Sequence, residues 1–345
     1  MERTTSSSSG DYDSSAAFSS CNSDISGEFL PGRRLTLSCA AENSDELMHE
    51  LICSLESTSI DEQKQAAMEL RLLAKNKPEN RLKIAQAGAI KPLILIMSST
   101  DQNLQENGVT AILNLSLCDE NKYPIKSLGA IKPLVSALTT GTAATRENAA
   151  CALLRLAESE EDKAVIGRAG AIQPLVNLLE SGGSRGKKDA ATALYSLCVT
   201  TENKVRAVDA GIVKLLVELM AEIGSNMVEK AGFVLRGLIT IPEARIELVK
   251  ESGIPVLVEI VEVGNRRQKE IAVAVLLQLC EETKIFCNIV AREGAIPPLI
   301  SLSQSSTSSA KKKAEALVEL LRQPRSESNL SVSMSQCESA KVTYN

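Results

Sequence analysis

Apolar residues in this chain recur at two spacings, one inside short segments and one between those segments. Within residues 147–157, Ala149, Leu153, Leu156 and Ala157 follow the three-to-four-residue spacing of one helix face. Similar Ala- and Leu-rich segments lie at 66–74, 109–116, 150–157, 191–198, 232–240, 273–280 and 314–321. The pattern therefore predicts a series of amphipathic helices.

A second phrase, Gly-Ala-Ile-x-Pro-Leu, keeps step with the first. It begins at Gly88, Gly129, Gly170 and Gly294, and weaker copies begin at Gly211 and Gly253. Successive copies are 41 residues apart, except for one step of 42. Two unrelated phrases that keep one period predict a repeat architecture, in which each unit buries its apolar faces against its neighbours.

Each repeat is predicted to hold three helices. A short helix ends at the Gly, which tolerates the left-handed conformation that often follows a helix. Pro92, Pro133, Pro174 and Pro298 come next and suit the first turn of a second helix. For one repeat we expect this second helix at 174–179, a polar loop at 181–186 and a third helix of about fourteen residues.

The Gly-Ala-Ile-x-Pro-Leu phrase, followed by Glu-Asn-Ala-Ala-Cys-Ala-Leu-Leu-Arg-Leu-Ala at 147–157, resembles armadillo repeats. More narrowly, it is similar to the repeats of plant U-box armadillo proteins, including members that carry the repeats alone. The resemblance covers residues 45–323. It implies an all-α fold, a right-handed α-solenoid of about seven repeats with about three helices each, whose first and last repeats are incomplete or capping.

Two Ser-rich tails flank the predicted solenoid of residues 45–323, at 1–44 and 324–345. Both lack apolar periodicity, so we expect them to be disordered. In the first tail, Arg33-Arg34-Leu35-Thr36 suits kinases that read basic residues, which makes Thr36 and Ser38 candidate phosphorylation sites. A chance match in Ser-rich sequence is the alternative.

Composition restricts the chemistry of the 345 residues. A single His, no Trp, 2% aromatic residues and a net charge of −5 argue against His-based catalysis, a metal site, a cofactor and a nucleic-acid surface. The nine Cys form no C-x-x-C pair, so reduced thiols packed as small hydrophobic groups are expected. No signal peptide or membrane span is evident, which favours the cytoplasm, the nucleus or both.

The resemblance also implies where a partner would bind, because armadillo third helices line a concave groove. Aligning the third helices by their period, and taking residues four and seven earlier on the same face, selects a set of mostly polar positions. These predicted groove residues are Asn107, Thr110, Asn114, Asn148, Cys151, Arg155, Asp189, Thr192, Ser196, Lys230, Phe233 and Gln278. The alternative for any one of them is that it only keeps an exposed helix soluble.

The predicted function is a non-enzymatic scaffold or adaptor that binds extended or helical segments of other proteins in this groove. One alternative is a substrate-recognition component of a ubiquitin-ligase pathway, because relatives join such repeats to a U-box, of which no core phrase is found here. The other is a nuclear-import adaptor. That class carries Trp and Asn rows on its third helices, whereas this chain has only Asn114 in the Asn row and no Trp.

Overall fold

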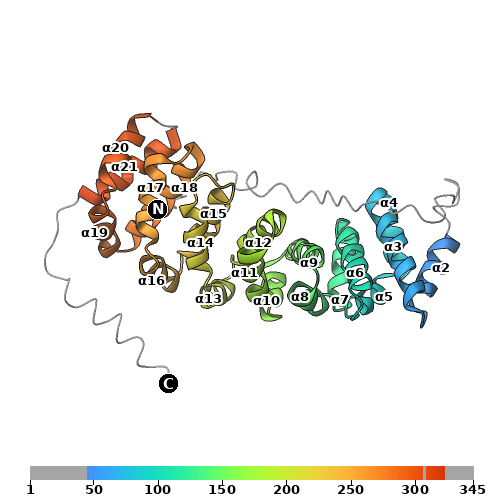
Figure 1. Ribbon diagram of the computed structural model, residues 1–345. Coiled ribbons are helices and arrows are strands. Elements are labelled where there is room, and N and C mark those ends of the chain that lie inside the picture. Colours follow the sequence, from blue (N-terminus) through green and yellow to red (C-terminus); the bar gives the residue numbers. More distant parts are fainter. Residues whose placement is uncertain (1–44, 306–307, 323–345) are drawn as a thin grey trace, which may run out of the picture. The chain divides into compact units, whose positions relative to one another are not determined.

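The computed structural model describes residues 45–305 and 308–322. Within these ranges it contains twenty α-helices, α2 to α21, and no strand (Figure 1). The helices belong to two compact units, of which the first ends at Val256 and the second begins at Leu257. The predicted all-α class is therefore confirmed. The candidate sites Thr36 and Ser38 lie outside the described residues.

The first unit repeats a three-helix arrangement. Its first helices are α4 (Pro78–Gln86), α7 (Asp119–Ser127), α10 (Glu160–Arg168), α13 (Thr201–Asp209) and α16 (Pro242–Lys250). Its second helices are α2 (Asp45–Leu55), α5 (Ile90–Ile96), α8 (Ile131–Thr140), α11 (Ile172–Ser181) and α14 (Ile212–Ala221). Its third helices are α3 (Ile60–Asn76), α6 (Gln102–Leu115), α9 (Ala143–Leu156), α12 (Ser184–Leu197) and α15 (Val228–Leu238).

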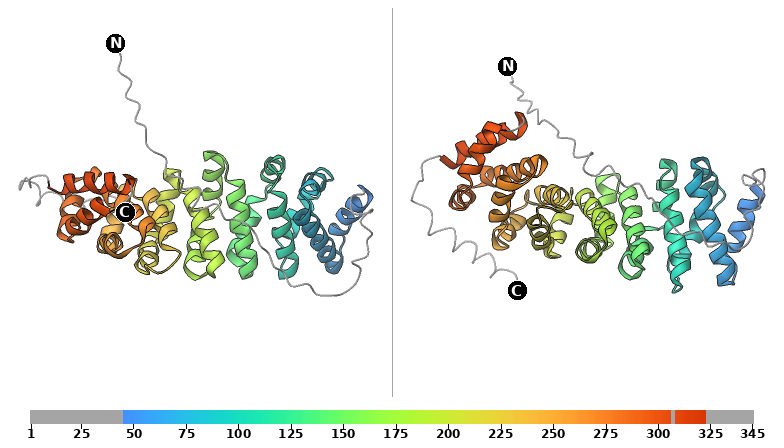
Figure 2. Two further views of the ribbon diagram at one scale, coloured as in Figure 1. Left: turned by 90° about the horizontal axis from the view of Figure 1, so that it is seen from above. Right: turned by 45° about the horizontal axis from the view of Figure 1, so that its top comes forward.

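Third helices of the first unit pack against one another in chain order. Helix α6 contacts α3 and α9, and α12 contacts α9 and α15. In both views of Figure 2 the helices coloured from blue to yellow follow one another through this unit. Their apolar faces are fully enclosed, as the 0% exposure of Ala149, Leu153 and Leu156 in α9 illustrates. Each repeat thus buries its core against the next one.

The second unit contains α18 (Arg266–Glu282), α19 (Lys284–Arg292), α20 (Ile296–Ser305) and α21 (Ser308–Arg322). Helix α17 (Gly253–Val263) crosses the boundary between the units. Within the second unit α21 packs against α18, α19 and α20. The order of first, second and third helix in α19, α20 and α21 repeats that of the first unit.

The corner between first and second helices is built as predicted in five repeats. Gly88, Gly129, Gly170, Gly211 and Gly294 all have φ between 77° and 96°, a region that L side chains disfavour. The predicted prolines lie in the first turn of the second helix that follows, for example Pro174 in α11. A Cβ on Gly170 would meet no atom within 4 Å, so steric crowding does not exclude a side chain there. Gly is therefore required by the backbone conformation.

The sixth corner differs from the prediction. Gly253 is the first residue of α17, and the left-handed residue is Ser252, with φ 56°. The 42-residue step in the sequence explains the difference, because a regular step of 41 from Gly211 falls on Ser252. Gly253 serves packing instead, since a Cβ there would lie 2.0 Å from Cδ1 of Leu248.

The polar loop predicted at 181–186 is shorter in the structure. Helix α11 continues to Ser181, and α12 begins at Ser184 with Gly183 as its N-cap. Gly186 lies inside α12 and is buried, and a Cβ there would crowd Glu147 and Leu178. Gly186 therefore serves close helix packing and is not part of a loop.

The cysteines predicted to pack as hydrophobic groups lie in two environments. Cys151, Cys198 and Cys280 are 4–6% exposed, and burial raises the pKa of the Cys198 thiol to about 12. Cys118 is half-buried, and its Sγ lies 2.9 Å from Oε2 of Glu120, so this position is more polar than expected. In the described residues no cluster of three or more His, Cys, Asp or Glu side chains has the arrangement of a metal site.

No single helix in the described ranges is long and apolar enough to cross a membrane. Helices α19 and α20 reach that length and composition only as a pair, and they are bent by 89° at their junction.

Candidate binding face

Polar side chains join successive third helices of the first unit. Arg71 on α3 donates from Nη1 to Oδ1 of Asn107 on α6 at 2.9 Å. Asn114 on α6 donates in return from Nδ2 to the carbonyl oxygen of Arg71 at 3.0 Å. Two side chains about two turns apart on α6 therefore fix its position against α3.

The same kind of link continues into the next two repeats. Asn148 on α9 donates from Nδ2 to Oγ1 of Thr110 at 2.9 Å, and Arg185 on α12 donates from Nη2 to Oδ1 of Asn148 at 2.9 Å. We call the set that joins α3, α6, α9 and α12 the polar ladder; it comprises Arg71, Asn107, Thr110, Asn114, Asn148 and Arg185. Because these groups bond to one another, the polar ladder is a structural element of the stack.

Burial divides the predicted groove residues into two halves. Six side chains are no more than 8% exposed, namely Thr110, Asn114, Asn148, Cys151, Asp189 and Thr192. We predicted that these six residues are available at a groove surface, but the structure buries them. They are short side chains on tightly packed helices, and three of them belong to the polar ladder, which occupies their hydrogen-bonding groups.

The other half is partly exposed: Asn107, Arg155, Ser196, Lys230 and Phe233 in the first unit, and Gln278 in the second. Of these, Asn107 accepts the hydrogen bond from Arg71. A binding role for this half remains a prediction, and within the first unit its members concentrate on α9, α12 and α15.

Sequence reasoning missed a neighbouring row on the same face. Leu154, Tyr195 and Arg236 occupy equivalent positions on α9, α12 and α15, and all three are at least partly exposed. The rings of Tyr195 and Phe233 meet edge to face, with centroids 6.4 Å apart and planes at 73°. The row lies three residues after Cys151, Thr192 and Phe233, which places it on the same side of each helix. The exposed face therefore includes one row of side chains that the sequence did not predict.

The negative charge of the buried Asp189 carboxylate is balanced by neighbouring positive charges. Burial raises the pKa of Asp189, while a hydrogen bond with Cys151 and the charges of Arg185 and Lys230 act in the opposite direction. Arg185 lies 3.3 Å from Oδ2 of Asp189 and 3.6 Å from Oε2 of Glu147. Arg185 thus holds two carboxylates from two successive repeats.

A second missed set lies on the first helices. Asn121 donates from Nδ2 to the carbonyl oxygens of Arg81, at 2.9 Å, and Leu115, at 3.1 Å. Asn203 makes the equivalent bonds to Lys163 and Leu197, both at 2.9 Å. Each Asn therefore links its own first helix to the first and third helices of the preceding repeat.

The sequence carried a signal for this second set. Glu-Asn followed by Lys or Arg occurs at 79–81, 120–122 and 202–204, and Glu-Asp-Lys occurs at 161–163, all in steps of 41 residues. The amides of Asn80, Asn121 and Asn203 are buried to 0–1% exposure, so this phrase marks packing. It is a third repeated phrase alongside the two that predicted the fold.

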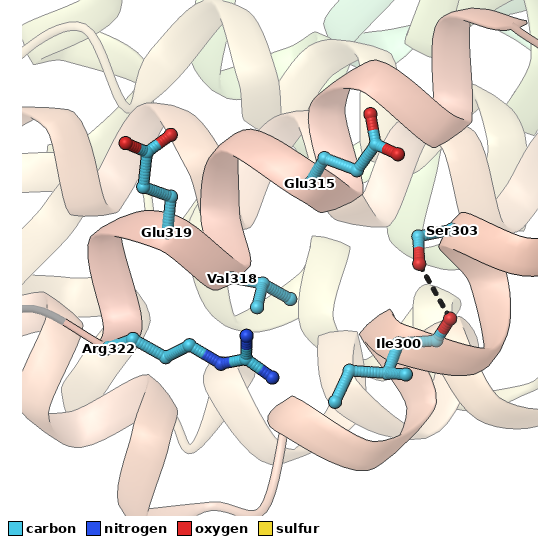
Figure 3. Close-up of a pocket in the computed structure, with 6 residues that line it drawn as sticks. All are labelled: Ile300, Ser303, Glu315, Val318, Glu319 and Arg322. Atoms are coloured by element: carbon cyan, nitrogen blue, oxygen red, sulfur yellow. Dashed lines mark hydrogen bonds between the residues drawn. The ribbon is translucent and has the colours of Figure 1, made fainter.

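The last third helix carries a pocket on the equivalent face, within the second unit. Glu315, Val318, Glu319 and Arg322 of α21 line it together with Ile300 and Ser303 of α20, and its volume is about 460 Å³ (Figure 3). The pocket is open and shallow, and it combines two carboxylates with one guanidinium and two apolar side chains.

Comparison with known families decides the identity of the repeats. The sequence matches the family described as "Plant U-box protein ARM repeat region" over residues 45–342. The chain belongs to this family. The predicted armadillo solenoid and the narrower resemblance to plant U-box repeat regions are therefore confirmed.

Individual relatives match over shorter stretches. Seventy residues are 51% identical to "U-box domain-containing protein 4" of Arabidopsis thaliana, which is 20% of this chain and 8% of that protein. A match of 70 residues to "E3 ubiquitin-protein ligase SPL11" of Oryza sativa subsp. japonica is 50% identical and again covers 20% of this chain and 10% of that protein. The matched stretches thus span a tenth or less of these curated relatives.

Solved structures agree on the fold. An engineered protein known from its crystal structure superimposes with a TM-score of 0.71 at 27% identity, over 81% of this chain and 69% of that one. A designed armadillo repeat protein in complex with the peptide (KR)4 gives a TM-score of 0.51 at 21% identity, over 79% of this chain and 99% of that one. The second likeness supports the armadillo fold alone.

Proposed function

We propose that this protein is a non-enzymatic scaffold or adaptor that binds an extended or helical segment of a partner protein. The binding surface is the third-helix face of the first unit, centred on α9, α12 and α15. The single observation that carries the proposal is the edge-to-face pair of Tyr195 and Phe233, partly exposed on a face that also carries Arg155 and Lys230. Aromatic and Arg side chains in such a setting are the usual anchors of protein interfaces.

Other features of the same face support this assignment. The polar ladder holds α3, α6, α9 and α12 in register, so the exposed side chains project from a rigid support, which reduces the entropy lost on binding. Stacked helical repeats commonly bind partners along one extended face. The described residues contain no arrangement that we interpret as a catalytic centre.

A test compares partners of the full chain in its native cells. Proximity labelling by the Arg155→Ala/Phe233→Ala double variant is expected to lose partners that the unchanged protein labels. The control is Lys132→Ala/Lys214→Ala, which alters two exposed side chains on the second helices α8 and α14. Equal labelling by all three proteins, with equal thermal melting, would contradict the proposal.

A second candidate function places this binding in a ubiquitin-ligase pathway. Family membership favours it, because the family is named for U-box proteins and one relative is named an E3 ubiquitin-protein ligase. The chain would then present substrates to a separate ligase. Incubated with activating enzyme, conjugating enzyme and ubiquitin, it is expected not to modify itself, whereas addition of the separate ligase would modify a protein bound to the face. Self-modification would contradict both roles.

Import-signal binding is the weakest candidate. In that class an Asn row holds the peptide backbone, but Asn114 is 2% exposed and bonded to the carbonyl oxygen of Arg71. A basic peptide is therefore expected to show no measurable affinity for the full chain.

A further inference from the structure

The chemistry of the candidate binding face narrows the kind of partner that it fits. Residues 151–157, 192–198 and 233–239 form the later halves of α9, α12 and α15, where the partly exposed side chains gather. None of these segments contains Asp or Glu, although 43 acidic residues occur in the chain. Arg155 and Arg236 are the charged residues within them, so this part of the face is purely cationic.

Carboxylates near this surface are already matched by other cations. Asp189 is buried and lies against Arg185, which also holds Glu147. Asp119, whose pKa is lowered mainly by Lys122 and in part by the charge of Arg155, is itself bound by Lys122 at 2.6 Å. Glu158, which follows α9, is held by Lys122 at 2.9 Å and Lys126 at 3.4 Å.

The two arginines are accessible to a ligand. Arg236 is exposed and Arg155 is partly exposed. Arg236 makes no hydrogen bond or ion pair with any described residue. Lys230, at the start of α15, acts on the buried Asp189 carboxylate. The two arginines have no Asp or Glu beside them in these three segments, which favours an anionic ligand.

An apolar centre separates the two arginines. Arg155 lies on α9 and Arg236 on α15, and α12 between them presents Tyr195, which contacts Phe233. Leu154 extends the apolar surface onto α9 and is partly exposed. The order across the three repeats is therefore cation, aromatic pair, cation.

We infer that the partner is an acidic peptide segment with an apolar residue between two carboxylates. The inference rests on the proposed function and specifies its ligand. The apolar side chain packs on Tyr195 and Phe233, while the flanking carboxylates bind Arg155 and Arg236. Packed helices lie about 8–10 Å apart, and an extended chain advances about 3.3 Å per residue. The carboxylates are therefore expected about six residues apart, with the apolar residue midway.

Selection from a phage-displayed library of random peptides on the full chain tests the ligand class. Recovered peptides are expected to be rich in Asp and Glu around one apolar residue. A fluorescein-labelled synthetic copy should bind with an affinity that falls as salt rises, while a matched peptide with Gln for Glu and an alternating Lys–Arg peptide should not bind.

Two variants locate the binding and separate the possible failures. Arg155→Glu/Arg236→Glu is expected to weaken binding of the acidic peptide by at least about tenfold. Lys132→Glu/Lys214→Glu makes the same change of net charge on the second helices and should leave binding unchanged. Circular dichroism melts of both variants establish that the fold is intact.

The remaining outcomes each contradict one claim. If the selected peptides were neutral or basic and bound the Tyr195→Ala/Phe233→Ala variant more weakly than the unchanged chain, the inference of an acidic ligand would be wrong. The proposed function would still hold. Peptides that bind this aromatic variant as well as the unchanged chain would overturn the proposed function itself. Failure to enrich any peptide would count against the function too.

Discussion

Asn203 donates a hydrogen bond from Nδ2 to the carbonyl oxygen of Lys163, one repeat earlier in the chain, at 2.9 Å. The same nitrogen also donates to the carbonyl oxygen of Leu197 in α12, at 2.9 Å. A Cβ on Gly167 would lie 1.7 Å from Oδ1 of Asn203, so α10 approaches this amide at the one residue without a side chain. A single buried amide thus ties three helices of two repeats together.

Replacing this amide should destabilise the first unit. Asn203→Ala leaves two buried carbonyl oxygens without their donor, which is expected to lower the free energy of unfolding by about 1–3 kcal/mol. Urea denaturation followed by circular dichroism measures the change. The control is Asn226→Ala, whose side chain is exposed and should change stability by less than about 0.5 kcal/mol. Equal midpoints for the two variants would contradict this role.

Much of the fold follows from the sequence because its repeated phrases encode local geometry. A Gly with positive φ marks every predicted corner but one, and at four of these corners a Pro confined to the first turn of the next helix follows it. Those constraints act within a few residues of the chain, so the spacing of Gly and Pro along the sequence is enough to predict the corners. The exception, Ser252, falls where the apolar phrase and the backbone period differ by one residue.

The candidate binding face was harder to predict because it depends on neighbouring repeats. Helical spacing places Thr110 and Tyr195 on similar faces, yet Thr110 is enclosed by α9 through Asn148, whereas Tyr195 remains partly exposed. Exposure is set by how closely adjacent third helices approach and by which side chains bridge them. A single repeat, taken alone, does not contain that information.

The left-handed Ser252 predicts a stabilising substitution. At φ 56° a side chain crowds its own backbone, so Ser252→Gly is expected to raise the free energy of unfolding by about 1 kcal/mol. The urea midpoint should shift upward accordingly. Ser225→Gly, in the turn that precedes α15, serves as the control, since no positive φ occurs there and Gly should give no gain. A lower midpoint for Ser252→Gly would contradict the prediction.

Gly170 allows backbone strain to be separated from steric crowding. Its φ is 91°, and a Cβ there meets no atom within 4 Å, so Gly170→Val should act through the backbone alone. A loss of about 2 kcal/mol is expected in urea denaturation. Gly237 offers the matched control, because a Cβ at this helical residue also meets nothing within 4 Å and its φ is ordinary. Similar losses for Gly170→Val and Gly237→Val would show that the corner tolerates a side chain.

Buried Asp189 should make the stability of the first unit depend on pH. Burial raises its pKa above the ordinary value of 3.8, against the opposing influence of Cys151, Arg185 and Lys230. As the pH rises above 3.8, the unfolded chain therefore releases this proton before the folded chain does. Its contribution to stability is present in acid and is lost as the pH rises through the raised pKa.

Asp189→Asn removes this titration and tests the sign. At neutral pH the variant is expected to have a higher urea midpoint than the unchanged protein, and the difference should shrink as the pH falls below 3.8. Asp119→Asn should behave in the opposite way, because the hydrogen bond from Lys122 lowers the pKa of Asp119. If Asp189→Asn were less stable at neutral pH, the ion pair with Arg185 would outweigh the burial of the carboxylate, and the predicted sign would be wrong.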